Sequence, residues 1–234
     1  VTLAIWGIVV LLAMVTWIPQ LKRENQTGQL PEPDPTNKLV WKSKMAWQVT
    51  FFMGLQSLLF FSLVAWLPEI LVSRGYSQET AGWMVSVMQI IGLPSALIVP
   101  ILADKFSNQR GIVATMGTLY FSGIFLLFFV EGNMILLAIS IILIGLPQGA
   151  GIGLSLTFLS LRARNSQQAA NLSGMAQSVG YFLAAIGPFI IGLIFDLFTS
   201  WNISIFILIM VSLMMTLAGL GAGRNEYAIS ETAA

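Results

Sequence analysis

The chain contains no cysteine and no histidine, and only 9% of its 234 residues are charged. The first two absences exclude disulfides, thiolate nucleophiles, Cys or His metal sites, serine–histidine catalysis and histidine proton relays. A soluble domain usually carries about 25% charged residues. So few charges cannot cover a water-soluble surface, and the solvent of most of the chain must be lipid. A net charge of +1 gives no electrostatic basis for binding nucleic acid.

Apolar residues are correspondingly abundant, at 56% of the chain, with a mean hydropathy of +0.84. A membrane-spanning helix needs roughly 20 mainly apolar residues, and seven stretches qualify. These stretches are residues 1–18, 45–71, 80–102, 111–130, 134–161, 169–195 and 201–221. They lack the period-2 alternation of barrel strands. The sequence therefore predicts an all-α, polytopic membrane protein.

The basic residues predict the orientation, because all eleven lie between the spans or at their ends. Arg74 is on one side of the membrane, and the other ten are on the opposite side. These ten are Lys22, Arg23, Lys38, Lys42, Lys44, Lys105, Arg110, Arg162, Arg164 and Arg224. Short loops rich in Lys and Arg stay in the cytoplasm. We expect a cell membrane protein, of a bacterial inner membrane, with its N-terminus outside and its C-terminus in the cytoplasm.

One long connection divides the chain. Residues 19–44 include P-E-P-D-P at 31–35 among polar residues, a composition that forms no packed core and is typical of a linker. The predicted organisation is a lone helix (1–18), a cytoplasmic linker (19–44), a six-helix block (45–222) and a cytoplasmic tail (223–234). Because Val1 already lies in an apolar run without an initiator Met, we expect a piece of a longer protein.

No Asp, Glu, Lys or Arg lies near the middle of any predicted span. Charged residues inside a membrane usually mark ion paths, proton relays or cofactor attachment. The carboxylate nearest to a span interior is Glu69, at the outer end of the second span. It is either a coupling group or a solvated loop residue. The sequence predicts no cofactor and no metal site.

Uncharged amides do recur inside the spans. They are Gln48, Gln56, Gln89, Gln148 and Gln177. A buried amide left unpaired costs about 1–3 kcal/mol, so each needs a helix partner, a water-filled cavity or a solute. Bonding between helices is the plainer alternative. Because spans two, three, five and six each present one, a shared cavity is favoured, with spans four and seven as lipid-facing supports. Gly145, Gly149 and Gly153 in span five predict close helix packing.

Residues 100–110 read P-I-L-A-D-K-F-S-N-Q-R. This resembles the loop motif of the major facilitator superfamily, with Asp104, Lys105 and Arg110 matching, while Gln109 replaces a basic residue. The resemblance extends over the whole chain, whose spans become helices six to twelve and whose residues 19–44 become the central linker. Within the superfamily, F-M-G-L-Q-S-L-L-F-F-S-L-V-A-W-L-P at 52–68 is similar to the cyanate/nitroimidazole transporter group.

The resemblance implies the C-terminal part of a secondary active transporter that moves a small polar or anionic organic solute, cyanate- or nitroimidazole-like, by alternating access. Its partners are then the solute, the lipid bilayer and the missing N-terminal half. The five amides would contact the solute, with Trp66 and Tyr181 adding shape or stacking. Asp104, Lys105 and Arg110 would form a cytoplasmic ion-pair latch; the alternative is a solvated loop that sets topology.

Three other classes compete with a transporter. A seven-helix receptor has the same orientation, but the N-P-x-x-Y of its last span is absent. A non-transporting membrane scaffold needs no site at all. A membrane-embedded enzyme needs a nucleophile–base pair or metal carboxylates in the bilayer, and neither appears, so we expect no enzyme.

Overall fold

The structure is a computed structural model that describes residues 36–229, together with Ala13, Met14 and Thr16. The chain divides into two compact units, residues 1–35 and residues 36–234. The predicted first helix (1–18) and most of the predicted linker thus lie outside the described residues. All of the long helices that the structure describes belong to the second unit.

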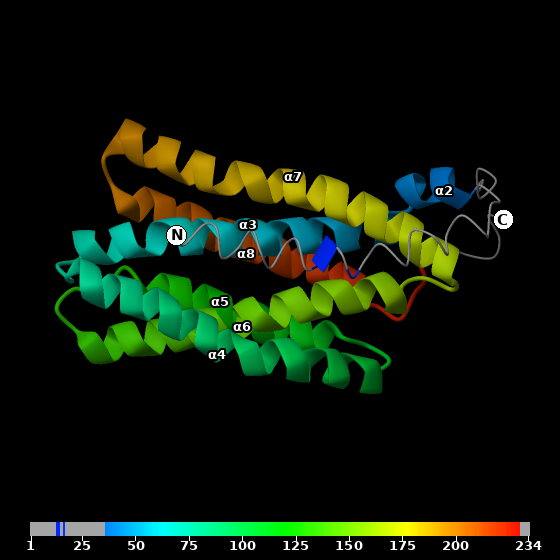
Figure 1. The fold of residues 1–234 in the computed structure, drawn as a ribbon, viewed down its shortest axis with the longest axis horizontal. Coiled ribbons are helices and arrows are strands. Elements are labelled where there is room, and N and C mark those ends of the chain that lie inside the picture. The colour runs from blue at the N-terminus through cyan, green and yellow to red at the C-terminus, as the bar shows by residue number, and fades with distance from the viewer. Residues whose placement is uncertain (1–12, 15, 17–35, 230–234) are drawn as a thin grey trace. The chain divides into compact units, whose positions relative to one another are not determined.

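Every element of the described part is an α-helix, and Figure 1 shows the long ones side by side in a bundle. The elements are α2 (Thr36–Lys42), α3 (Lys44–Ser73), α4 (Gln78–Lys105), α5 (Arg110–Leu126), α6 (Met134–Leu161), α7 (Ser166–Phe198) and α8 (Trp201–Ala222). The helices α3 to α8 coincide with the six spans predicted between residues 45 and 221, which confirms the fold class. All but α5 are long and apolar enough to cross a membrane.

The helix α5 is shorter than its predicted span, which reaches residue 130. Its 17 residues rise about 26 Å, slightly less than the roughly 30 Å hydrocarbon core. The amides of Leu127, Phe128 and Phe129 then bond to carbonyls three residues earlier. These tighter turns continue from the end of α5 to Val130. The apolar run that predicted the span is therefore longer than the α-helix within it.

Short polar residues start four of the helices. The side chains of Ser43, Ser77, Asn133 and Asn165 accept hydrogen bonds from backbone amides in the first turns of α3, α4, α6 and α7. Each bond satisfies an amide that has no partner within its helix. These caps fix where each apolar run becomes helical, and so keep the connections short.

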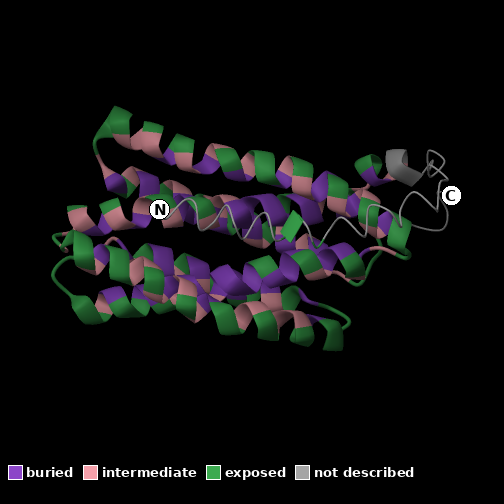
Figure 2. Ribbon diagram, in the orientation of Figure 1, coloured by how far each residue is buried: buried purple, intermediate pink, exposed green. Residues whose placement is uncertain are grey.

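The helices pair in a definite pattern. The helix α3 packs along α7 and α8, α4 packs along α6, and α5 lies against α6 and α8. About half of the apolar core of α3 and of α6 is buried, against 11% for α4 and 17% for α7. Figure 2 shows the exposed surface of α7 and α4 on the two sides of the bundle. Within this unit, α3 and α6 are therefore the central helices.

The contact between α4 and α6 is made backbone to backbone. A methyl group added at Gly149 would lie 1.8 Å from the carbonyl oxygen of Gly92. One added at Gly145 would meet the carbonyl of Met88 at 2.6 Å. The hydroxyl of Ser95 also donates to the carbonyl of Leu146 across the two helices, at 2.7 Å. The close packing predicted from the glycine spacing in residues 145–153 is confirmed.

Both flanks of the six-helix block are more structured than predicted. The helix α2 occupies the end of the predicted linker and packs against α7, with Val40 fully buried. In the predicted tail, Ala228 and Ile229 are buried, and the Ala228 amide donates to the carbonyl of Arg162 at 2.8 Å. Apolar residues within these polar stretches pack against the surface of the bundle. The average composition of the stretches did not predict this packing.

Candidate functional site

A cleft lies on the surface that α3, α6 and α7 form together. Its deeper part has a volume of about 140 Å³. The lining residues are Met53, Gln56, Ser57, Phe60, Phe61, Ile152, Ser155, Leu156 and Tyr181. A shallower cavity of about 400 Å³ shares Phe61 and Tyr181 with it and extends along α7 to Pro188. The two cavities therefore adjoin at these two side chains.

Buried polar groups without hydrogen-bond partners gather at the deep part of this cleft. Gln56 is 1% exposed, and its Nε2 has no partner within the described residues. Ser155, at 2% exposed, leaves its Oγ without one. A methyl group at Gly151 would come within 2.5 Å of the Gln56 Cγ, so the bare backbone of α6 is what makes room for this side chain.

Gln148 adds a second unpaired amide. It is 2% exposed, and neither its Nε2 nor its Oε1 has a partner in the described structure. Residues four and seven positions apart share one face of a helix, so Gln148 lies on the same face of α6 as Ile152 and Ser155, which line the cleft. An unsatisfied buried group costs about 1–3 kcal/mol. Water or a solute that bonds to these groups would recover that energy.

The remaining predicted solute-binding residues are engaged elsewhere. Gln48 accepts a hydrogen bond from Arg224 Nη2 at 3.2 Å, and Gln177 donates to Ser173 within α7 at 2.6 Å. The Trp66 indole donates to the carbonyl of Pro188 at 2.7 Å, and Gln89 is half-buried on α4. The structure therefore brings Gln56 and Tyr181 into one cavity and leaves the others, Gln148 included, outside its lining.

The predicted gating residues lie at the bundle ends. Asp104 and Lys105 are exposed at the end of α4, and the Arg110 Nε donates to the carbonyl of Leu220 on α8 at 3.0 Å. Within the described residues, no ion pair joins Asp104 to Lys105 or Arg110. Glu69 is exposed at the opposite end of the bundle. A latch and a coupling carboxylate at these positions remain predictions.

A buried arginine that sequence reasoning placed in a loop organises the same end of the bundle. Arg162 is 2% exposed; its Nε donates to the carbonyl of Ala222 at 2.8 Å, and its Nη2 donates to Gln109 Oε1. Gln109 Nε2 in turn donates to the carbonyls of Ala103 and Phe106. The network ties the ends of α4, α6 and α8 to the start of α5. Burial lowers the pKa of the Arg162 guanidinium, against the opposing effects of Tyr227 and Glu226.

The sequence contained one indication of this hydrogen-bond network, namely a departure from the loop motif. Gln109 stands where the loop motif of the resembled family has a basic residue. A glutamine can accept a hydrogen bond from the guanidinium and donate hydrogen bonds to carbonyls at once, which a second cation cannot do. The departure from the motif is thus explained by what Gln109 contacts.

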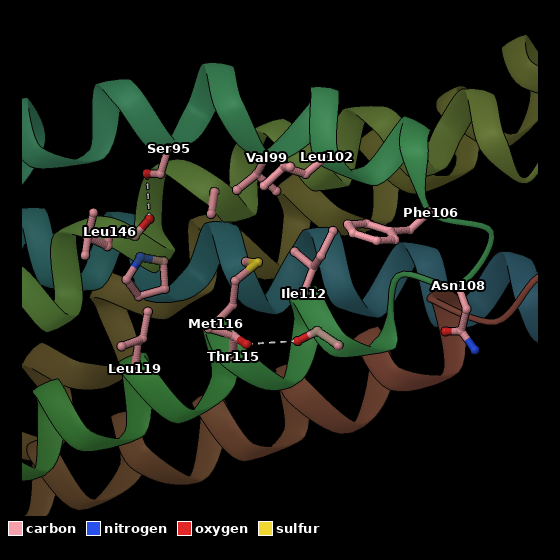
Figure 3. A pocket seen from close by; sticks show the side chains of 13 residues that line it. Ser95, Val99, Leu102, Phe106, Asn108, Ile112, Thr115, Met116, Leu119 and Leu146 are labelled. Atoms are coloured by element: carbon pink, nitrogen blue, oxygen red, sulfur yellow. Dashed lines mark hydrogen bonds between the residues drawn. The ribbon is translucent and has the colours of Figure 1, made fainter.

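A larger cavity of about 570 Å³ lies between α4, α5 and α6 (Figure 3). Its lining is mostly apolar, and two of its polar side chains are already bonded. The Ser95 hydroxyl donates to the carbonyls of Gly92 and Leu146, and the Thr115 hydroxyl donates to that of Gly111. This cavity has room for a solute, but both hydroxyls already donate their hydrogen bonds to helix carbonyls. The α3–α6–α7 cleft is the better candidate for a polar solute.

Comparison with known proteins adds the family. The sequence matches the family described as Major Facilitator Superfamily over residues 1–188. It is 50% identical to an uncharacterized transporter, YycB, of Bacillus subtilis, over 95% of this chain and 55% of the relative. It is 38% identical to the 2-nitroimidazole transporter of Escherichia coli, over 92% and 54% respectively. Identity to the cyanate transport protein CynX of Escherichia coli is 24%, over 82% and 49%. The chain spans about half the length of these relatives.

Proposed function

The chain belongs to the major facilitator superfamily and resembles its cyanate/nitroimidazole transporter group, as the sequence predicts, and from this premise we propose that it is the C-terminal part of a secondary active transporter. The proposed cargo is a small polar or anionic organic solute. The observation that carries the proposal is the cleft lined by the unpaired Gln56 and Ser155; Gln148, also unpaired, lies on the same face of α6 as Ser155. Buried polar groups normally have hydrogen-bond partners. A site that binds and releases a solute is a physical reason for Gln56 and Ser155 to lack partners within the protein.

The proposed partner of this unit is the N-terminal half of the transporter. Its relatives are about twice as long as the chain. The helices α4 and α7 leave most of their apolar surface uncovered, far more than α3 or α6. Uncovered apolar faces on a multi-pass membrane protein suit contact with further helices or with lipid. The solute cleft, which α7 borders, would then be closed by the second half.

The mechanism that we propose is alternating access, in which the two halves rock about a site near the middle of the membrane. Water would bond to Gln56 and Gln148 when the cleft is open, and the solute would replace that water. The end that carries Lys105, Arg110 and Arg162 would face the cytoplasm, by the distribution of basic residues. Asp104 with Lys105 and Arg110 remains the candidate latch there, and Glu69 the candidate coupling group at the other end.

The test uses the complete transporter, reconstituted in vesicles, with radiolabelled 2-nitroimidazole, cyanate and 4-hydroxybenzoate as probes. Gln56→Leu and Gln148→Leu each remove an amide that would bond to the solute. Loss of one such bond, at about 1–3 kcal/mol, corresponds to a 5- to 150-fold loss of transport efficiency. The matched control is Gln167→Leu, because Gln167 is exposed on α7, away from the cleft. Equal uptake by all three variants at equal protein content would contradict the proposal.

A further inference from the structure

The larger cavity, between α4, α5 and α6, has the length of one membrane leaflet. Its lining on α4 extends from Ser95 to Phe106, eleven residues further on, a rise of about 16 Å along a helix. The hydrocarbon core of a bilayer is roughly 30 Å thick, so the lining covers about half of it. Ser95 lies near the middle of α4, and Phe106 follows its last residue. The cavity thus extends from the middle of the bundle to the end that carries Lys105.

The cavity is a groove because α4 and α5 both pack along α6, and much less on each other. Pro147 and Ala150 of α6 line its floor, and Leu102 of α4 and Thr115 of α5 are exposed on its two sides. Figure 3 shows the side chains of α4 and α5 on opposite sides of this space. A Cβ added at Gly111, where α5 begins, would meet nothing within 4 Å. A neighbouring molecule can therefore enter this α4–α5 groove, of about 570 Å³, from the side of the bundle.

The walls of the α4–α5 groove suit hydrocarbon. The hydroxyl of Ser95 donates to the carbonyl of Leu146 at 2.7 Å, and that of Thr115 donates to the carbonyl of Gly111 at 3.0 Å. Apart from Asn108 at one end, the other side chains of the lining are apolar. An occupant therefore gains by burying apolar surface, and a hydrocarbon occupant loses no hydrogen bond in doing so.

Polar and basic groups lie at one end of the groove. The Oδ1 of Asn108 accepts the amide of Arg110 at 3.0 Å, and its Nδ2 is a donor at the same end. Lys105 is exposed three positions after Leu102, on the groove side of α4, whereas Asp104 lies two positions after Leu102, on the opposite side. By the distribution of basic residues this end faces the cytoplasm, where the leaflet carries anionic lipids.

From this length, lining and charge we propose that the α4–α5 groove binds one acyl chain of an anionic phospholipid of the cytoplasmic leaflet. The end of the chain lies beside Ser95, and the phosphate lies near Lys105 and Asn108. The groove thus matches both parts of an amphiphile, with apolar walls along its length and a cation at its mouth. This lipid site is separate from the α3–α6–α7 cleft and goes beyond the proposed transport function.

A photoactivatable lipid tests the site in the complete transporter. Phosphatidylglycerol with a diazirine at the end of one acyl chain is added to phosphatidylcholine vesicles that contain the protein, and labelled peptides are identified by mass spectrometry after illumination. We expect the label near Ser95 and Leu146, at the deep end of the groove. A diazirine next to the glycerol should instead label residues near Phe106. A pattern that does not change with the diazirine position, or that is as strong on α7 as along the groove, would overturn the proposal.

Filling the groove should displace the lipid. Thr115→Phe places a ring in it and should remove most of the label. The matched control is Thr118→Phe, because Thr118 is exposed on the same helix and also donates to the carbonyl four residues earlier, but lies outside the lining. Leu102→Trp fills the groove from α4 and provides a second variant if Thr115→Phe does not fold. Labelling of the filled variants that equals that of Thr118→Phe would contradict the proposal.

Lys105→Gln tests the headgroup. One cation near the membrane surface changes the affinity for anionic lipid about fivefold, so labelling by the phosphatidylglycerol probe should fall by that factor. Labelling by the matching phosphatidylcholine probe, already weaker in the wild type, should not change. Lys42→Gln is the control, with the same change of charge on the exposed Lys42 of α2. Equal labelling of the wild type by both probes would exclude an anionic lipid, and displacement of the label by excess 2-nitroimidazole would assign the groove to the solute. Because no transport is measured, this result does not depend on the proposed function.

Discussion

A single methyl group at Gly149 should separate α4 from α6. The Cβ of Gly149→Ala would lie 1.8 Å from the carbonyl oxygen of Gly92, 2.5 Å from its carbonyl carbon and 2.8 Å from its Cα. Contacts below 3.0 Å are not tolerated, so the two helices must move apart by about 1.2 Å. Every atom in the way belongs to backbone, and no side chain can rotate aside.

The cost depends on the contacts that such a separation disrupts. The Ser95–Leu146 hydrogen bond, at 2.7 Å, joins the same two helices and would lengthen with them. Overpacking a tight contact costs about 1–3 kcal/mol, occasionally more, and the better helix propensity of alanine returns at most about 1 kcal/mol. We expect a net loss of about 1–2 kcal/mol, which lowers the Tm of the complete protein by about 2–4 °C, because the shift per kcal/mol falls as a protein grows.

The assay is thermal unfolding of the complete protein in detergent, followed by the fluorescence of its tryptophans. Gly82→Ala is the matched control, because Gly82 lies on α4 with nothing within 4 Å of an added Cβ. Its Tm should stay the same or rise slightly. A Gly149→Ala protein as stable as the Gly82→Ala protein would refute the backbone-to-backbone contact on which the α4–α6 pairing depends.

Substitutions at three further residues probe the polar contacts between helices, with Tm as the common measurement. Arg162→Met removes the charged donor to Gln109 and should lower the stability by about 3 kcal/mol. Arg162→Lys should not restore the lost stability, because one ammonium cannot reproduce both directed hydrogen bonds. Equal stability of the wild type and Arg162→Met would exclude a structural network. Tyr76→Phe removes the hydroxyl that donates to the carbonyl of Val130 and should cost about 1 kcal/mol, and an unchanged Tm would argue against that bond. Trp66→Phe loses the indole donor to Pro188 and should cost a similar amount, about 1 kcal/mol, whereas Trp66→Ala should cost more by opening a cavity.

Four of the six long helices carry two independent sequence signals that agree at their starts. The apolar run gives each span, and a Ser or Asn cap such as Ser77 or Asn133 fixes its first residue. The pairing of helices was not predictable, since apolar faces of similar width are interchangeable. The glycines of residues 145–153 predicted a close helix approach, and the structure supplies the partner, α4.

The fate of each amide could not be read from its own helix. Gln48 and Gln56 lie two turns apart on α3, yet the first accepts a hydrogen bond from Arg224 and the second has an unpaired Nε2 in the described structure. The difference comes from the chain end that follows α8, more than 160 residues away. The local sequence shows that a buried amide needs a hydrogen-bond partner. Only the tertiary structure determines whether a partner lies within reach.

The distribution of these partners bears on how such a unit can move. At the end that carries Arg162, side-chain hydrogen bonds join α4, α5, α6 and α8. At the opposite end, Arg74 donates to Asn202, and Tyr76 donates to the carbonyl of Val130, so the α3–α4 connection is tied to the start of α8 and to the α5–α6 connection. Between the ends, Gly149 locks α4 to α6 through backbone contact. Relative motion within the unit would have to break several of these contacts together, while motion of the whole unit breaks none. The alternating access that we propose therefore breaks the fewest contacts if all six helices move as a rigid body against a second half. The unpaired Gln56 and Gln148 would then keep their positions relative to each other.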